Sequence, residues 1–71
     1  MLIKRSFSLA GHRTSVALEA PFWRALEDVA TGQGRALAGL VAAVDAARDP
    51  GETLASALRV LALAEVGRGK T

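Results

Sequence analysis

One short segment with a period of two residues constrains the fold of this chain more than any other feature. In Arg13 to Glu19 the large apolar side chains fall on every second position, which is the pattern of a half-buried β-strand. The apolar face of the segment carries Val16 and Leu18, and the other face carries Arg13, Ser15 and Ala17. A lone strand leaves its backbone N–H and C=O groups without partners, so it has to pair with a second strand.

The sequence leaves two alternatives for the strand that pairs with this segment. The same segment of a second copy would give a two-stranded antiparallel ribbon shared by an intertwined dimer. Alternatively, residues 3–9 of the same chain fold back on it as a hairpin through Ala10-Gly11-His12. We favour the ribbon between two chains, because a domain of 71 residues buries a marginal core by itself and has no cysteine for a disulfide. The sequence thus predicts a homodimer of mostly α chains, each with one N-terminal strand.

Three helices are expected after the strand. Pro21 fits the first turn of a helix, and apolar residues then recur with helical spacing. The expected boundaries are about 13–19 for the strand, 21–31, 36–48 and 52–66 for the helices, and 67–71 for a basic tail, in a single domain over residues 1–66. The side chains expected in the core or at the dimer interface are Val16, Leu18, Phe22, Leu26, Leu37, Leu40, Val41 and Val44.

The chemically active side chains argue against an enzyme or a metalloprotein. The chain has no cysteine and a single histidine, His12, with no acid or nucleophile at a useful spacing. We therefore expect no cofactor and no metal, and a structural role for His12 near the start of the strand. No apolar run reaches the ~18 residues of a membrane span, and the N-terminus does not have the pattern of a secretory signal. We expect a cytoplasmic protein.

The order and spacing of these elements resemble those of a known family. The strand Arg13-Thr14-Ser15-Val16-Ala17-Leu18-Glu19, an amphipathic helix, Gly32-Gln33-Gly34-Arg35 and a second apolar helix resemble the ribbon-helix-helix family of bacterial DNA-binding proteins. Lys4-Arg5-Ser6, Phe22-Trp23 and Ser56-Ala57-Leu58-Arg59-Val60 are similar to its short stand-alone members. The third helix is additional to the minimal family fold.

The resemblance implies a homodimer that inserts its ribbon in the major groove of double-stranded DNA and regulates transcription. The base-contacting residues that it implies are Arg13, Ser15 and Ala17, and the phosphate-contacting residues are Arg35, Ala36 and Leu37. Lys4 and Arg5 precede the strand and are expected to hold phosphates as well, in contacts that carry no sequence information. The alternative is that Arg13 and Ser15 form the solvent-exposed face of an ordinary strand and contact no DNA.

The apolar third helix leaves a second function open. It packs on the domain as a structural cap, or it presents Val60 and Leu63 to a partner. The alternative to a DNA-binding regulator is therefore a protein-interaction module, such as an antitoxin or an adaptor, whose C-terminal helix docks a partner protein. In either case Arg59 is expected to pair with Asp45, Glu52 or Glu65.

Overall fold

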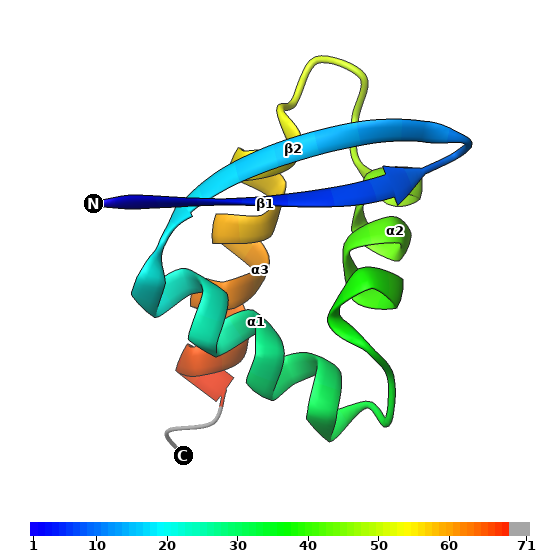
Figure 1. Ribbon diagram of the computed structural model, residues 1–71. Helices are drawn as coiled ribbons and strands as arrows, with labels where there is room; N and C mark the ends of the chain where they lie inside the picture. Colours follow the sequence, from blue (N-terminus) through cyan, green and yellow to red (C-terminus); the bar gives the residue numbers. More distant parts are fainter. Residues whose placement is uncertain (69–71) are drawn as a thin grey trace.

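A β-hairpin lies across three helices (Figure 1). The structure is a computed structural model, and it describes residues 1–68. The hairpin consists of β1, Leu2–Leu9, and β2, His12–Glu19. The helices are α1, Ala20–Gly32, α2, Leu37–Ala47, and α3, Leu54–Arg68. The predicted order of ribbon, helix, helix and additional C-terminal helix is confirmed, with two strands in the chain where one was expected.

The two strands pair with each other within one chain. Their antiparallel register ends with Leu9 opposite His12. Ala10 and Gly11 connect them with positive φ angles of 51° and 82°, the signs that a type I′ hairpin turn requires. This is the hairpin alternative, and the ribbon between two chains stays a prediction. The reason for the hairpin lies in residues 6–9, where polar and apolar side chains alternate and Phe7 and Leu9 add a second apolar row to the core.

The two faces of the hairpin differ in burial. Phe7, Leu9, Val16 and Leu18 are buried against the helices. The opposite face, which we call the outer hairpin face, consists of Lys4, Ser6 and Ser8 on β1 and Arg13, Ser15 and Ala17 on β2. All of it is exposed except the half-buried Ala17. Because successive side chains of a strand point to opposite sides, burial of the apolar row fixes the polar row towards solvent.

The helices complete the core beneath the hairpin. The buried side chains are Trp23, Leu26 and Ala30 on α1, Leu40 and Val41 on α2, and Leu54, Leu58 and Ala62 on α3. Of the side chains that the sequence places in the core, Val16, Leu18, Leu26, Leu40 and Val41 are buried, and Phe22, Leu37 and Val44 are half-buried against them. The third helix packs against α1, α2 and β2, so it is an integral part of the domain.

The ends of the last helix follow local signals. Thr53 Oγ1 accepts a hydrogen bond from the Ser56 amide at 3.1 Å, which satisfies one of the free amides at the start of α3. Of the basic tail expected over 67–71, Gly67 and Arg68 belong to α3, and the other residues lie outside the described part of the chain. Among the helices of residues 1–68, none has the length and hydropathy of a membrane span.

Candidate nucleic-acid interface

Three cross-strand pairs build the outer hairpin face. Counted from the turn, they are Ser8 opposite Arg13, Ser6 opposite Ser15, and Lys4 opposite Ala17. Directly opposed side chains have Cβ atoms about 4.5–5.5 Å apart, and the Oγ atoms of Ser6 and Ser15 lie 3.1 Å apart, within hydrogen-bond distance. The face is therefore a narrow strip of hydroxyl groups with a cation towards each end.

The charge of this strip is positive. Within residues 1–68, Lys4 and Arg13 make no ion pair. The acid at the end of β2, Glu19, is bound by Arg59, whose Nη2 lies 3.1 Å from Oε1 of the carboxylate. Its own backbone amide and the Arg59 guanidinium hold the pKa of Glu19 below its ordinary value. The carboxylate charge is therefore compensated, and the ammonium and guanidinium groups of the strip dominate the local field.

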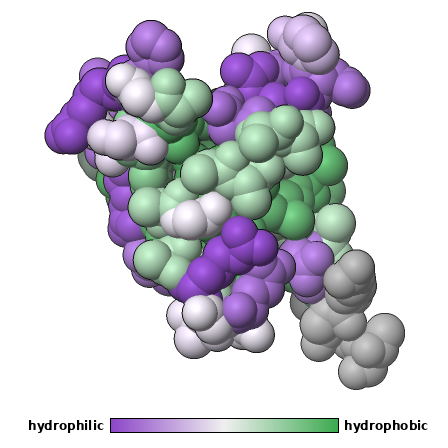
Figure 2. Space-filling view, turned by 90° about the vertical axis from the view of Figure 1, so that its right-hand side faces the viewer, coloured by the Kyte–Doolittle hydropathy of each residue, from purple (hydrophilic) through white to green (hydrophobic). Residues whose placement is uncertain are grey.

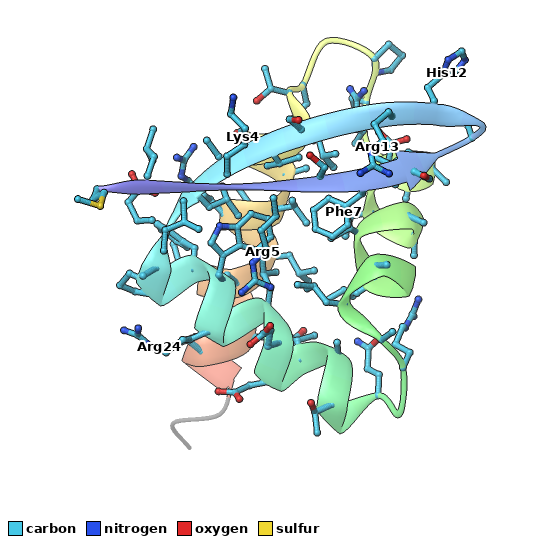
Figure 3. The ribbon with its side chains drawn as sticks, in the orientation of Figure 1. Lys4, Arg5, Phe7, His12, Arg13 and Arg24 are labelled. Atoms are coloured by element: carbon cyan, nitrogen blue, oxygen red, sulfur yellow. The ribbon has the colours of Figure 1, made fainter. Side chains whose placement is uncertain are left out.

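The neighbours Lys4 and Arg5 lie on opposite faces of β1 (Figure 3). Lys4 projects from the outer hairpin face, whereas Arg5 turns towards α1. Nη1 of Arg5 donates to Oε2 of Glu27 at 2.9 Å, and its guanidinium lies 5.1 Å from the centre of the Trp23 ring. The sequence predicted that both residues would hold phosphates. Of the two, only Lys4 shares a face with Arg13.

The start of α2 forms a separate polar surface. Ala36 is its N-cap and has no side-chain hydrogen bond to the helix. Arg35 donates from Nε to Oε1 of Gln33 at 2.9 Å and from Nη1 to the Gly39 carbonyl at 3.4 Å. In Figure 1 the connection from α1 to α2 lies at the end of the molecule away from the hairpin. The structure therefore does not bring the predicted phosphate contacts Arg35, Ala36 and Leu37 next to the predicted base contacts Arg13, Ser15 and Ala17.

Three other residues that the sequence analysis singled out lie outside the outer hairpin face. His12 is exposed beside the turn, opposite Leu9. Trp23 is buried, and its Nε1 donates a hydrogen bond of 2.8 Å to the Ile3 carbonyl, which fastens β1 to α1. The Arg59 guanidinium binds Glu19 at the end of β2, whereas the sequence predicted a partner among Asp45, Glu52 and Glu65.

The contribution of β1 to the interface was not expected from the sequence. Ser6 and Ser8 lie on the outer hairpin face directly opposite Ser15 and Arg13. The signal for them was the alternation of Ser6-Phe7-Ser8-Leu9, which continues into β2 after a connection of two residues. Two alternating segments separated by two residues, the second of them glycine, are typical of a hairpin.

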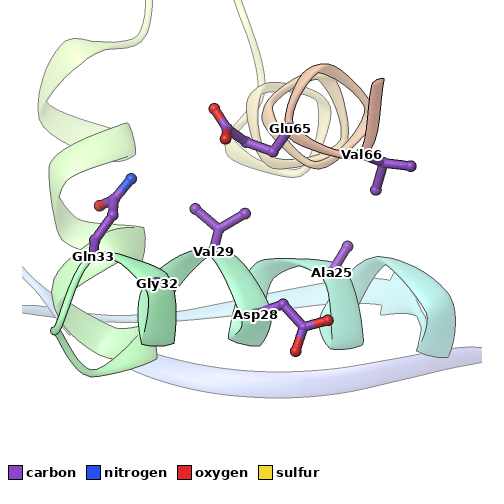
Figure 4. A pocket seen from close by; sticks show the side chains of 7 residues that line it. All are labelled: Ala25, Asp28, Val29, Gly32, Gln33, Glu65 and Val66. Carbon is purple, nitrogen blue, oxygen red and sulfur yellow. The ribbon is translucent and has the colours of Figure 1, made fainter. Parts of the chain in front are cut away.

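A concave surface of different character lies between α1 and α3 (Figure 4). This cleft has a volume of about 350 Å³. Its lining combines the apolar Ala25, Val29 and Val66 with the polar Asp28, Gln33 and Glu65. Carboxylates at the rim repel the phosphates of a nucleic acid. We therefore restrict the candidate nucleic-acid interface to the outer hairpin face.

The fold and the site define the class of protein. A two-stranded ribbon that presents cations and hydroxyl groups on a helical base is an architecture for contact with the major groove of DNA. A family model described as the ribbon-helix-helix domain matches residues 2–66, which include both strands and most of α3. The chain belongs to the ribbon-helix-helix family, a family of DNA-binding regulators. No curated protein and no solved structure matches the chain.

Proposed function

We propose that the protein is a sequence-specific regulator of transcription that binds double-stranded DNA through the outer hairpin face and acts in the bacterial cytoplasm. The observation that carries this proposal is the row of exposed hydroxyl groups, with Lys4 and Arg13 free of acidic partners within residues 1–68. A two-stranded ribbon fits the width of the major groove, where each base pair presents a distinct pattern of donors and acceptors. Membership of the ribbon-helix-helix family supports the same function.

Base recognition is assigned to alternate residues of β2. The Arg13 guanidinium donates two hydrogen bonds to O6 and N7 of a guanine, a contact that discriminates against other bases by about 1–3 kcal/mol. The Ser15 hydroxyl donates to or accepts from either kind of base edge, and the methyl group of Ala17 packs on the methyl group of a thymine. All three residues lie on the same side of β2, so they follow one another along the groove.

Phosphate contact beside the groove is assigned to Lys4. Its ammonium group is on the same face as Arg13 and reaches the flanking backbone as a point charge. The first amides of α2, at Ala36 and Leu37 beside Arg35, suit an anion. They lie at the far end of the molecule from the hairpin, so a phosphate held there belongs to another stretch of DNA than the one in contact with Arg13.

The exposed face of α2 is the surface that we propose for a homodimer. Its residues are small and exposed, namely Ala38, Gly39, Ala42, Ala43 and Ala46. The helix has one charged residue, Asp45, and its carboxylate is bound by Arg48 at 3.0 Å. Figure 2 shows this side of the molecule, where apolar residues gather over α2. A helix of a second copy can approach closely there, because no exposed charge has to be desolvated.

Binding to a randomised pool of duplex DNA tests the proposed function. We expect the wild-type protein to shift the pool in a gel and to enrich related sequences, and we expect Arg13→Ala to weaken binding by about tenfold or more. Arg24→Ala is the matched control, because Arg24 is an exposed arginine on α1 and its loss changes the net charge equally. If both variants lose the same affinity, contact through the hairpin is excluded and only the overall charge matters.

The exposed side of α3 supports a second candidate function. Val60, Leu63 and Val66 expose 59, 71 and 46% of their surface. They recur every three residues on one helix, and clustered apolar surface of this kind is found at protein interfaces. Under this hypothesis the protein is an interaction module of the antitoxin or adaptor type, and the hairpin serves only the fold. Absence of duplex binding by the wild-type protein in the experiment above would favour it.

A further inference from the structure

We propose that the cleft between α1 and α3 is a binding site for a small amphipathic organic cation, which is a molecule with one ammonium group on a short apolar body (Figure 4). The proposal goes beyond DNA binding, because the residues that line the cleft belong to α1, to its C-cap and to α3, and not to the hairpin. Three properties of the cleft carry it, namely its open volume, its apolar floor and its negative charge.

Small side chains on α1 leave the space for a ligand. Ala25, Val29 and Gly32 lie four and three positions apart, so they share the side of α1 that faces α3. A Cβ added at Gly32 meets no atom within 4 Å. The volume of about 350 Å³ lies at the lower end of the range of about 300–1,000 Å³ that is typical of ligand pockets. The cleft therefore has the size for a small molecule.

The floor of the cleft is apolar. Val29 of α1 is half-buried, and Val66 of α3 exposes 46% of its surface. Ala25, which is also half-buried, adds a methyl group to the same lining. A hydrocarbon chain placed against these side chains is removed from water, which is favourable and requires no directed contact. The floor by itself thus selects a ligand with an apolar body, whatever its charge.

The rim gives the cleft a negative charge. Asp28 on α1 and Glu65 on α3 both line it, one on each helix (Figure 4), and none of the described lining residues is basic. Asp28 makes no ion pair in the part of the chain that the structure describes. Carboxylates on an apolar concave surface focus a negative potential, which attracts a cation and repels an anion. The rim therefore adds a selection for positive charge.

An arginine beside the cleft is held at another place. Arg35 donates from Nε to Oε1 of Gln33 at 2.9 Å, and Gln33 is a neutral lining residue. Nη1 of Arg35 donates to the Gly39 carbonyl of α2 at 3.4 Å, so the guanidinium stays at the start of α2 and does not line the cleft. An ammonium group of a ligand has three donors and no acceptor, which suits the carboxylate oxygens of Asp28 and Glu65.

Three probes with the same hexyl body test the proposal, namely hexylammonium, hexanol and hexanoate. Each is titrated into the isotope-labelled full chain, and the backbone amide signals of Val29, Gly32 and Val66 are followed by NMR. We expect hexylammonium to shift these signals to saturation and to bind about fivefold or more tightly than hexanol, with hexanoate the weakest. Equal affinity for the three probes, or shifts confined to other residues, overturns the proposal.

Two neutral variants test the selection for charge. We expect Asp28→Asn and Glu65→Gln each to weaken hexylammonium binding by about threefold or more and to leave hexanol binding unchanged. Asp49→Asn is the matched control, because Asp49 is an exposed acid in the connection between α2 and α3 and its loss changes the net charge equally. The same loss of affinity in the control would show that the cation senses only the overall charge, and would contradict a site at this rim.

A larger side chain in the cleft tests the location of the site. Gly32→Leu is expected to lower hexylammonium affinity by about tenfold or more, because its side chain occupies the open space. Gly51→Leu is the control, since a Cβ at Gly51 also meets no atom within 4 Å and lies outside the cleft. Circular dichroism shows whether each variant is folded, and the two neutral variants decide if Gly32→Leu is not. Unchanged binding by folded Gly32→Leu places the cation outside the cleft and overturns the proposal.

Discussion

The guanidinium of Arg59 on α3 binds the carboxylate of Glu19 at the last residue of β2, at 3.1 Å, although the two residues are 40 positions apart. The same guanidinium lies 5.7 Å from the centre of the Phe22 ring on α1. The third helix thus holds the junction at which the hairpin passes into the first helix. This explains why a helix beyond the minimal family fold belongs to the domain: it fixes the direction in which the hairpin leaves the helical base.

The Glu19–Arg59 pair makes the stability of the protein dependent on pH. The pKa of Glu19 is lowered in the folded state by its own backbone amide and by Arg59, whereas in the unfolded chain it takes the ordinary value of about 4.3. The stabilisation is therefore complete above about pH 5 and is lost as the pH falls through the lowered pKa. We expect Glu19→Gln to be less stable than wild type at pH 7, with urea midpoints that converge as the pH is lowered towards 3.

The control for this prediction is the same change made in an Arg59→Gln background. Without the guanidinium, Glu19→Gln removes a smaller interaction, so the difference between the curves at pH 7 is expected to shrink. The part of the stabilisation that comes from the backbone amide of Glu19 remains. A stability difference that is the same at every pH, in both backgrounds, would show that the loss comes from packing and not from the carboxylate charge.

Two leucines on α3 provide a matched pair for the role of this helix. Leu58 is fully buried in the core cluster, whereas Leu63 is 71% exposed on the same helix. We expect Leu58→Ala to lower the free energy of unfolding by about 2–5 kcal/mol, because it leaves a cavity in the core. Leu63→Ala is expected to change it by less than about 0.5 kcal/mol. Urea denaturation followed by circular dichroism measures both, and equal effects would contradict the observed packing of α3.

Much of the architecture was accessible from periodicity. The helical spacing of apolar residues predicts three helices in the regions where α1, α2 and α3 lie, and the alternation of Val16 and Leu18 predicts the buried face of β2. These signals are local, because one face of each element has to be buried whatever covers it. Either partner strand supplies β2 with backbone hydrogen bonds, so periodicity does not decide between the two pairings. The structure shows the hairpin, which was the less favoured alternative.

The parts that sequence reasoning missed depend on contacts between distant residues. Nothing near Arg59 in the chain indicates Glu19 as its partner, since a helix and a strand end must first meet in space. Arg5 is different, because neighbouring residues on a strand face opposite sides. Recognition of β1 as a strand would have separated Arg5 from Lys4 and added Ser6 and Ser8 to the interface.

The hairpin turn offers a prediction about stability. Ala10 has a φ of 51°, in the left-handed region that is costly for alanine, and asparagine tolerates this region better. We expect Ala10→Asn to raise the free energy of unfolding by about 0.5–1 kcal/mol, or the melting temperature by about 3–6 °C. Gly11→Ala is expected to lower it by about 1 kcal/mol through backbone strain alone, because a Cβ there meets no atom within 4 Å.

The matched control for the turn is Gly51→Ala. An added Cβ at Gly51 also meets nothing within 4 Å, and its φ lies outside the left-handed region. The same substitution is therefore expected to be neutral or slightly stabilising there. Thermal denaturation compares the variants. Equal destabilisation at both glycines would mean that the φ of Gly11 does not determine the effect.

Substitutions of the adjacent cations Lys4 and Arg5 are expected to affect different properties, DNA binding for Lys4 and stability for Arg5. Lys4 lies on the outer hairpin face, so we expect Lys4→Ala to weaken duplex binding and to reduce the slope of log K against log salt concentration by about one. Arg5→Ala breaks the exposed pair with Glu27 and the contact with the Trp23 ring. We expect it to lower the free energy of unfolding by about 1 kcal/mol and to leave the salt slope unchanged. Fluorescence anisotropy over a salt series and urea denaturation measure the two effects. Equal reduction of the salt slope by both variants would place Arg5 against the DNA and contradict the orientation of β1.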